Sequence, residues 1–197
     1  EFLKAAVERQ QFGKDPAIPA AEGRDVVIVG TGDTAADCVA TALRQGCRSV
    51  TQLVRRPVED YLKDGKLPLD YAQEEALEVF GRDPRRFGTQ VRELVTEGDA
   101  LTGVVTGEGE TLPCTLLIAA TGFAGCAPGV CRAFGVDCGE TVQTAEGHFA
   151  TSVEKVFAAG DMRRGQSLVV WAIAEGRTVA AEVDAYLTGY TNIVRTV

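Results

Sequence analysis

Histidine is almost absent from this sequence, and its scarcity limits the chemistry that the protein can perform. His148 has no second histidine to pair with, so a histidine-based metal site or a Ser-His-Asp triad has little support. No apolar run approaches the roughly 20 residues that cross a bilayer, and the opening residues, 1–4, do not resemble a signal peptide. We therefore expect a soluble, cytoplasmic protein without a catalytic histidine.

Positive charge is also in short supply. The 20 lysines and arginines are outnumbered by 28 acidic residues, which gives a net charge of −8. Nucleic acids and anionic membranes require a basic surface, so we expect neither as a partner. The arginine pairs at 55–56 and 163–164 should then serve local purposes.

The six cysteines lack the C-x-x-C spacing of common zinc and ferredoxin sites. Cys126, Cys131 and Cys138 form a loose group with spacings of five and seven residues. Without a signal peptide, reduced thiols are favoured over disulfides. We therefore predict small buried or loop thiols and no metal ligands.

The most informative stretch is DVVIVGTGDTAAD, at residues 25–37. Residues 26–29 form a β-branched apolar run, typical of a strand buried on both faces of a parallel sheet. The G-x-G-x-x-A turn and the helix start that follow comprise Gly30, Gly32, Asp33, Thr34 and Ala35. Such a turn lets main chain and a helix N-terminus approach a pyrophosphate.

The residues after this turn complete a βαβ unit. A helical segment runs to Gln45, and residues 49–54 are predicted to form a second strand. Dinucleotide sites for NAD usually have an acid near the end of that strand, but Arg55 and Arg56 stand there instead. Two guanidiniums favour the 2′-phosphate of NADP. The alternative to dinucleotide binding is a purely structural glycine turn, and the alternative to phosphate binding by the two arginines is a solvated strand end.

Further elements are predicted along the chain from periodicity and turn residues. We expect helices over 2–11, 71–80 and 167–187, a hairpin of strands 91–95 and 101–106, and buried strands over 116–120 and 156–159. Both buried strands end in small or polar residues, as strands do where their carboxyl ends meet a ligand. A helix opening at residue 2 without a cap suggests a chain cut from something longer.

Residues 156–176 carry a second motif. An acid, Asp161, follows a predicted strand and Gly160, and a helix begins near Ser167. This arrangement can place a carboxylate on a polyol and a positive helix end on a flavin ring. From the pattern alone, a structural strand-to-helix turn is an equal alternative.

Residues 159–173, AGDMRRGQSLVVWAI, closely resemble the C-terminal flavin motif of the glutamate synthase small (β) subunit. Residues 30–38 resemble that family's NADPH-binding fingerprint, and the likeness continues in order over nearly the whole chain. The resemblance, which extends to the NADPH/FAD portion of dihydropyrimidine dehydrogenase, implies an α/β fold. We expect a helix and linker (1–22), a Rossmann-like NADPH-binding domain (23–115) and the returning half of a Rossmann-like FAD-binding domain (116–197).

The resemblance also implies the cofactor contacts, but no catalytic residue. For NADPH they are Gly30, Gly32, Asp33 and Thr34 at the pyrophosphate, and Arg55, Arg56 and Arg48 at the 2′-phosphate. For FAD they are Gly160, Asp161, Gln166, Ser167 and Leu168. Thr121 and Gly122, which follow the predicted strand 116–120, are also predicted to contact a cofactor.

In that family, hydride passes from NADPH to FAD, and electrons continue through iron–sulfur clusters held towards the N-terminus. They reach a large subunit that makes glutamate from glutamine and 2-oxoglutarate. The present sequence matches neither the first FAD fingerprint nor the cluster-binding cysteines. The alternatives are another NADPH-linked flavoprotein with a different acceptor, and a truncated nucleotide- or partner-binding domain without turnover.

Overall fold

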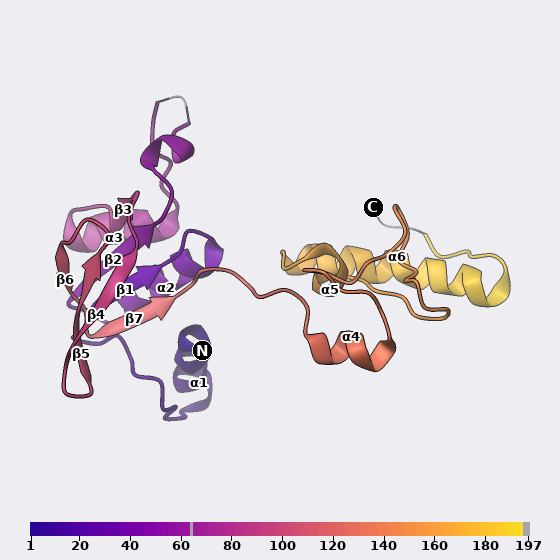
Figure 1. The fold of residues 1–197 in the computed structure, drawn as a ribbon, viewed down its shortest axis with the longest axis horizontal. Coiled ribbons are helices and arrows are strands. Elements are labelled where there is room, and N and C mark those ends of the chain that lie inside the picture. The colour runs from indigo at the N-terminus through magenta and orange to yellow at the C-terminus, as the bar shows by residue number, and fades with distance from the viewer. Residues whose placement is uncertain (64, 195–197) are drawn as a thin grey trace. The chain divides into compact units, whose positions relative to one another are not determined.

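The computed structural model describes residues 1–63 and 65–194, and the chain divides into two compact units, Glu1–Gly122 and Phe123–Val197 (Figure 1). Asp64 and the final residues of the predicted 116–197 segment, 195–197, lie outside the described residues. Among the residues that the structure describes, no helix has the length and apolar character to cross a membrane.

A four-stranded parallel sheet forms the centre of the first unit (Figure 1). Its strands, in spatial order, are β3 (Arg85–Phe87), β2 (Ser49–Val54), β1 (Asp25–Val29) and β7 (Leu116–Ala119). Helix α2 (Asp33–Arg44) connects β1 to β2, as the βαβ prediction required. The Rossmann-like α/β fold class is therefore confirmed.

The two faces of this sheet are covered differently. Helices α1 (Phe2–Phe12), α2 and α3 (Tyr71–Phe80) contribute to one hydrophobic core, which contains Val26 and Ile28 of β1. Val27 faces a second core that includes Val104 and Leu112 of an antiparallel sheet. The continuous apolar run in β1 exists because both faces of that strand are buried.

The antiparallel sheet has the order β4-β5-β6, with β4 at Val91–Glu97, β5 at Ala100–Thr106 and β6 at Thr111–Pro113. The β4–β5 pair is the predicted hairpin. Strand β3 and the short helix η1 (Val58–Tyr61) were not predicted. The sequence of β3, Arg-Arg-Phe, has no apolar alternation, and the strand depends on pairing with β2.

The predicted domain boundary at residue 115 is wrong. Strand β7 pairs with β1 in the register Val26↔Leu116 to Val29↔Ala119, so it belongs to the first sheet. Helix α1 also packs onto this unit, since Phe2 lies in its core. The first unit therefore extends to Gly122 and includes the residues predicted as a separate N-terminal segment.

The second unit contains α4 (Pro128–Phe134), α5 (Asp161–Arg164) and α6 (Val169–Thr188). Helix α6 ends at Gly189, as predicted, but begins two residues later than expected. The strand predicted over 156–159 is absent from the described residues, where this stretch forms a single bridge, Ala150↔Phe157. An apolar run becomes a strand only where a neighbouring strand supplies hydrogen bonds.

The prediction that all cysteines are reduced is also wrong. Cys131 and Cys138 form a disulfide, while the other four cysteines are free. Gly135, in the left-handed conformation (φ 65°), ends α4 and reverses the chain. The Cα atoms of the two cysteines thereby come within 6.3 Å, a separation that spacing in the sequence does not reveal.

Candidate nucleotide-binding site

The glycine turn follows β1 at the carboxyl edge of the parallel sheet. Gly30 has a φ of 140°, and a Cβ atom there would lie 2.0 Å from the carbonyl oxygen of Ala120, just beyond β7. Only glycine fits so close an approach of two backbones. Gly30 is therefore required by the packing of β1 against the end of β7, in addition to the turn itself.

Gly32 has different surroundings. A Cβ atom there would meet no heavy atom within 4 Å, and Gly32, Asp33 and Thr34 are all exposed. Gly32 is the N-cap of α2, and in the described chain no side chain caps this helix. Amide groups of its first turn are thus available, at the positive end of the helix, to a ligand that approaches through open space.

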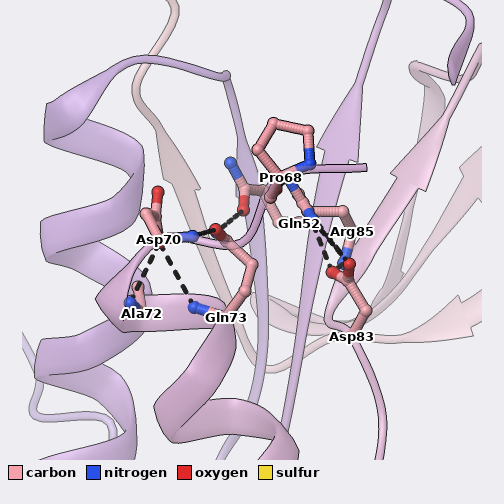
Figure 2. Close-up of polar contacts among 7 residues, drawn as sticks. All are labelled: Gln52, Pro68, Asp70, Ala72, Gln73, Asp83 and Arg85. Carbon is pink, nitrogen blue, oxygen red and sulfur yellow. Dashed lines mark hydrogen bonds and ion pairs between the residues drawn. The ribbon is translucent and has the colours of Figure 1, made fainter. Parts of the chain in front are cut away.

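A chain of buried amides supports this turn. The Gln52 side chain of β2 donates to the carbonyl oxygen of Gly30 at 2.9 Å, and Gln73 of α3 donates to Gln52 at 3.4 Å. Figure 2 shows that Gln73 also accepts from the backbone of Asp70, whose carboxylate caps α3. Gln52 was not predicted as part of the site, although an amide side chain within the apolar strand SVTQLV was a usable signal.

Arg55 and Arg56 follow β2 at the same edge of the sheet. Both are exposed, and neither guanidinium has an ion-pair partner among residues 1–63 and 65–194. A pocket of about 440 Å³ adjoins the first of them, lined by Arg55, Gly88, Thr89, Gln90, Gly107 and Glu108. The amide of Thr89 donates to the carbonyl oxygen of Val54 at 3.1 Å, which holds the pocket beside the end of β2.

Arg48 does not belong with this pair. It precedes β2, at the amino edge of the sheet, and its guanidinium binds the carboxylate of Asp25, with Nε 3.0 Å from Oδ1. The hydrogen bond from Arg48 holds the pKa of Asp25 below its usual value. The six residues of β2 separate Arg48 from Arg55, so the structure does not bring Arg48 together with the two arginines predicted beside it at the 2′-phosphate.

In the second unit, Glu175 of α6 binds three residues of the motif over 156–176 that resembles a flavin site. Glu175 is only 6 % exposed. Its Oε2 accepts from the amide of Gly160 at 2.8 Å, and its Oε1 accepts from Arg163 at 2.8 Å and from Arg164 at 3.1 Å. Glu175 was not predicted from the sequence, although it is the one acid in the apolar first turns of the helix.

The predicted flavin contacts begin at Gly160, which binds Glu175, and continue along the chain to the start of α6. Gly160 is buried with a φ of 64°, and a set of exposed residues follows it: Asp161, Gln166, Ser167 and Leu168. Leu168 is the N-cap of α6, which has no side-chain cap in the described chain. Thr121 and Gly122 instead belong to the first unit, because they directly follow Ala120, whose amide donates to Val29 at 2.7 Å.

The first unit thus combines a parallel sheet, a glycine turn with open space at Gly32 and, within the residues that the structure describes, a helix start without a side-chain cap and two arginines without ion-pair partners at one edge. These features define a nucleotide-binding α/β protein of the Rossmann type. The chain belongs to the pyridine nucleotide-disulphide oxidoreductase family, whose pattern matches residues 3–176.

Curated relatives narrow the likeness further. The chain is 39 % identical to the glutamate synthase [NADPH] small chain of Bacillus subtilis, over 89 % of this chain and 42 % of that protein. It is 40 % identical to the Mycobacterium tuberculosis protein of the same name, over 96 % and 44 %, so it spans less than half of either relative. The Schizosaccharomyces pombe glutamate synthase [NADH] is 32 % identical, over 90 % of this chain and 10 % of its own length. The resemblance to glutamate synthase small chains is confirmed.

Solved structures support the fold alone. A ferredoxin reductase from Rhodopseudomonas palustris has a TM-score of 0.65 at 20 % identity, covering 88 % of this chain and 43 % of its own. The thioredoxin reductase of T. acidophilum has the same TM-score at 22 % identity, covering 85 % and 53 %.

Proposed function

We propose that the first unit binds NADPH and that the chain is part of a flavin oxidoreductase of the glutamate synthase small-chain type. The proposal rests on two exposed guanidiniums at the end of β2, those of Arg55 and Arg56, which have no ion-pair partner in the described part of the chain; Arg55 also lines a pocket. The pyrophosphate would bind the amides after Gly32, and Arg55 with Arg56 would bind the 2′-phosphate. The open space at Gly32 and the uncapped start of α2 fit such a ligand.

The second unit would contribute to an FAD site. Bound FAD supplies hydride acceptance from NADPH and one-electron transfer onwards. The amide of Gly160 is already bound by Glu175, so this pairing would fix the turn that presents Asp161 to the cofactor's polyol. The uncapped start of α6 at Leu168 would favour negative charge on the reduced ring. We therefore assign positioning roles to these residues.

In the intact protein, electrons would pass through iron–sulfur clusters outside this chain to a large subunit. There they would support glutamate formation from glutamine and 2-oxoglutarate. The similarity to glutamate synthase small chains at 39–40 % identity supports this route. The test is glutamate formation by the full-length protein with its large subunit, dependent on NADPH and glutamine. Flavin reduction by NADPH without glutamate formation would point to another acceptor.

Nucleotide choice is tested by a pair of variants. Arg55→Ala should lower the preference for NADPH over NADH by about 1 to 3 kcal/mol, or roughly 5- to 150-fold in the ratio of dissociation constants. Arg48→Ala removes an arginine from the opposite edge and should leave this ratio unchanged. Equal affinities of the unmutated chain for both nucleotides would contradict the assignment.

One observation favours NADH as a second candidate. Glu108 lines the same pocket, where its carboxylate accepts from Thr89 at 3.0 Å, and NAD sites use a carboxylate to bind the ribose 2′-hydroxyl. If NADPH is the ligand, Glu108→Gln should tighten its binding because a negative charge beside the phosphate is removed. If NADH is the ligand, the same change should weaken NADH binding.

A further inference from the structure

Three of the six cysteines come together in the second unit. The sulfur atoms of Cys126, Cys131 and Cys138 all lie within 4.8 Å of one another. Cys126 precedes α4, Cys131 lies within it, and Cys138 follows the turn that ends it. Neither the NADPH site nor the proposed flavin contacts use this cluster.

Main-chain contacts hold the three segments together. The amide of Cys126 donates to the carbonyl oxygen of Glu140 at 2.9 Å. Gly125 has a φ of 87°, and a Cβ atom there would lie 2.8 Å from the same oxygen. The amide of Val136 donates to the carbonyl oxygen of Cys131 at 3.1 Å after the turn at Gly135. The backbone itself therefore brings the three cysteines together, apart from any bond between their sulfurs.

The disulfide uses only two of the three sulfurs. The third, Cys126 Sγ, lies 3.5 Å from Cys131 Sγ and is only half-buried. Three thiolates around a tetrahedral zinc ion, with Zn–S bonds of about 2.3 Å, lie about 3.8 Å apart. The separation of Cys126 Sγ from Cys131 Sγ is already close to that value, and reduction of the disulfide would free Cys131 and Cys138 to reach it. We propose that, once the disulfide is reduced, Cys126, Cys131 and Cys138 bind one soft divalent cation such as Zn²⁺.

The chemistry of this site balances with a dithiol as the reductant. The dithiol gives two electrons and two protons to the Cys131–Cys138 disulfide, producing two thiols and an oxidised dithiol. The three thiols then release three protons to the solvent, and three sulfur–metal bonds form. Cys138 is exposed, so solvent can occupy the fourth position. Disulfide and metal are therefore mutually exclusive states of the cluster.

The test is a titration of the reduced chain with Co²⁺, whose thiolate complexes absorb light by charge transfer. The chain is reduced with a dithiol, which is then removed without oxygen. We expect one equivalent of Co²⁺ to bind, with thiolate charge-transfer absorption that Zn²⁺ abolishes. Cys126→Ala and Cys138→Ala should each weaken binding by at least about 100-fold, because each removes a ligand.

The control is Cys38→Ala, in the first unit. Burial raises the pKa of the Cys38 thiol to about 11, so this side chain does not supply a thiolate. We expect the Cys38→Ala chain to bind Co²⁺ as tightly as the unmutated chain does. Circular dichroism spectra establish that each variant is folded. Cys138→Ala should disturb the fold least, because Cys138 is exposed. Absence of charge-transfer absorption, or equal affinities in Cys138→Ala and the unmutated chain, would overturn the proposal.

Discussion

Gly30 and Gly32, two residues apart in one turn, should respond in opposite ways to substitution. In Gly30→Ala, the added methyl group would lie 2.0 Å from the carbonyl oxygen of Ala120, at a φ of 140°. Backbone strain costs about 1 to 3 kcal/mol and overpacking about the same again, so the free energy of unfolding should fall by about 2 to 6 kcal/mol. That is a large share of the 5–15 kcal/mol typical of a domain.

Gly32→Val should spare the fold and harm binding. The residue has an ordinary φ of −86°, and no heavy atom lies within 4 Å of the added Cβ. The free energy of unfolding should change by less than about 1 kcal/mol. The branched side chain would occupy the space through which a pyrophosphate reaches α2, so NADPH affinity should fall at least about tenfold.

Urea unfolding followed by circular dichroism measures the first effect, and calorimetric titration with NADPH measures the second. If Gly32→Val unfolds as well as losing NADPH binding, the glycine is structural and the assigned role is refuted. Normal NADPH binding by Gly32→Val, or a Gly30→Ala chain as stable as the unmutated one, would also refute these roles.

Three further predictions concern stability, the second unit and colour. Arg48 lowers the pKa of Asp25 in the folded state, so the ion pair stabilises the fold above the pKa of Asp25 in the unfolded chain, and this stabilisation is lost as the pH falls through the folded-state pKa. Arg48→Ala should therefore raise the midpoint pH of acid unfolding. Below the folded-state pKa, the variant and the unmutated chain should differ little in the free energy of unfolding. Glu175→Ala should lower the free energy of unfolding in urea by about 1 to 3 kcal/mol, because it leaves Gly160, Arg163 and Arg164 without their acceptor. Glu175→Gln keeps an acceptor for Gly160 and should lose less; equal losses in the two variants would contradict this role. The 197-residue chain alone should be colourless and self-associate on gel filtration, because the start of α6 exposes Leu168, Val169 and Val170 by 57–70 %; a yellow monomer would contradict this.

Elements with local start and stop signals could be predicted from the sequence. Helix α3 occupies the predicted residues because Asp70 caps it with Gln73 in a capping box and Gly81 ends it in the left-handed conformation. Strand β2 likewise matches its prediction. By contrast, residues 156–159 have a strand-like composition but lack a pairing strand in the described chain. Strand formation depends on a neighbour that the local sequence does not encode.

The candidate site shows the same division. The glycine turn was predicted because its spacing is local. Arg48 and Arg55 flank the predicted strand 49–54, so their separation to opposite edges of the sheet already followed from that strand, and the structure bears out its bounds. Glu175 was missed because it acts on Gly160, 15 residues away. A metal site at the three cysteines was not predicted, because their spacing matches no common motif. The structure brings their sulfurs together through a left-handed turn at Gly135, which the spacing does not reveal.

The proposed NADPH site lies where β1 meets α2. The most direct measurement is amide NMR of the isotopically labelled chain during titration with NADPH. We predict that the largest shift changes occur at residues 30–34 and at Arg55, and that they saturate at one equivalent. Shift changes that are absent, or that centre on residues away from this turn, would contradict the account.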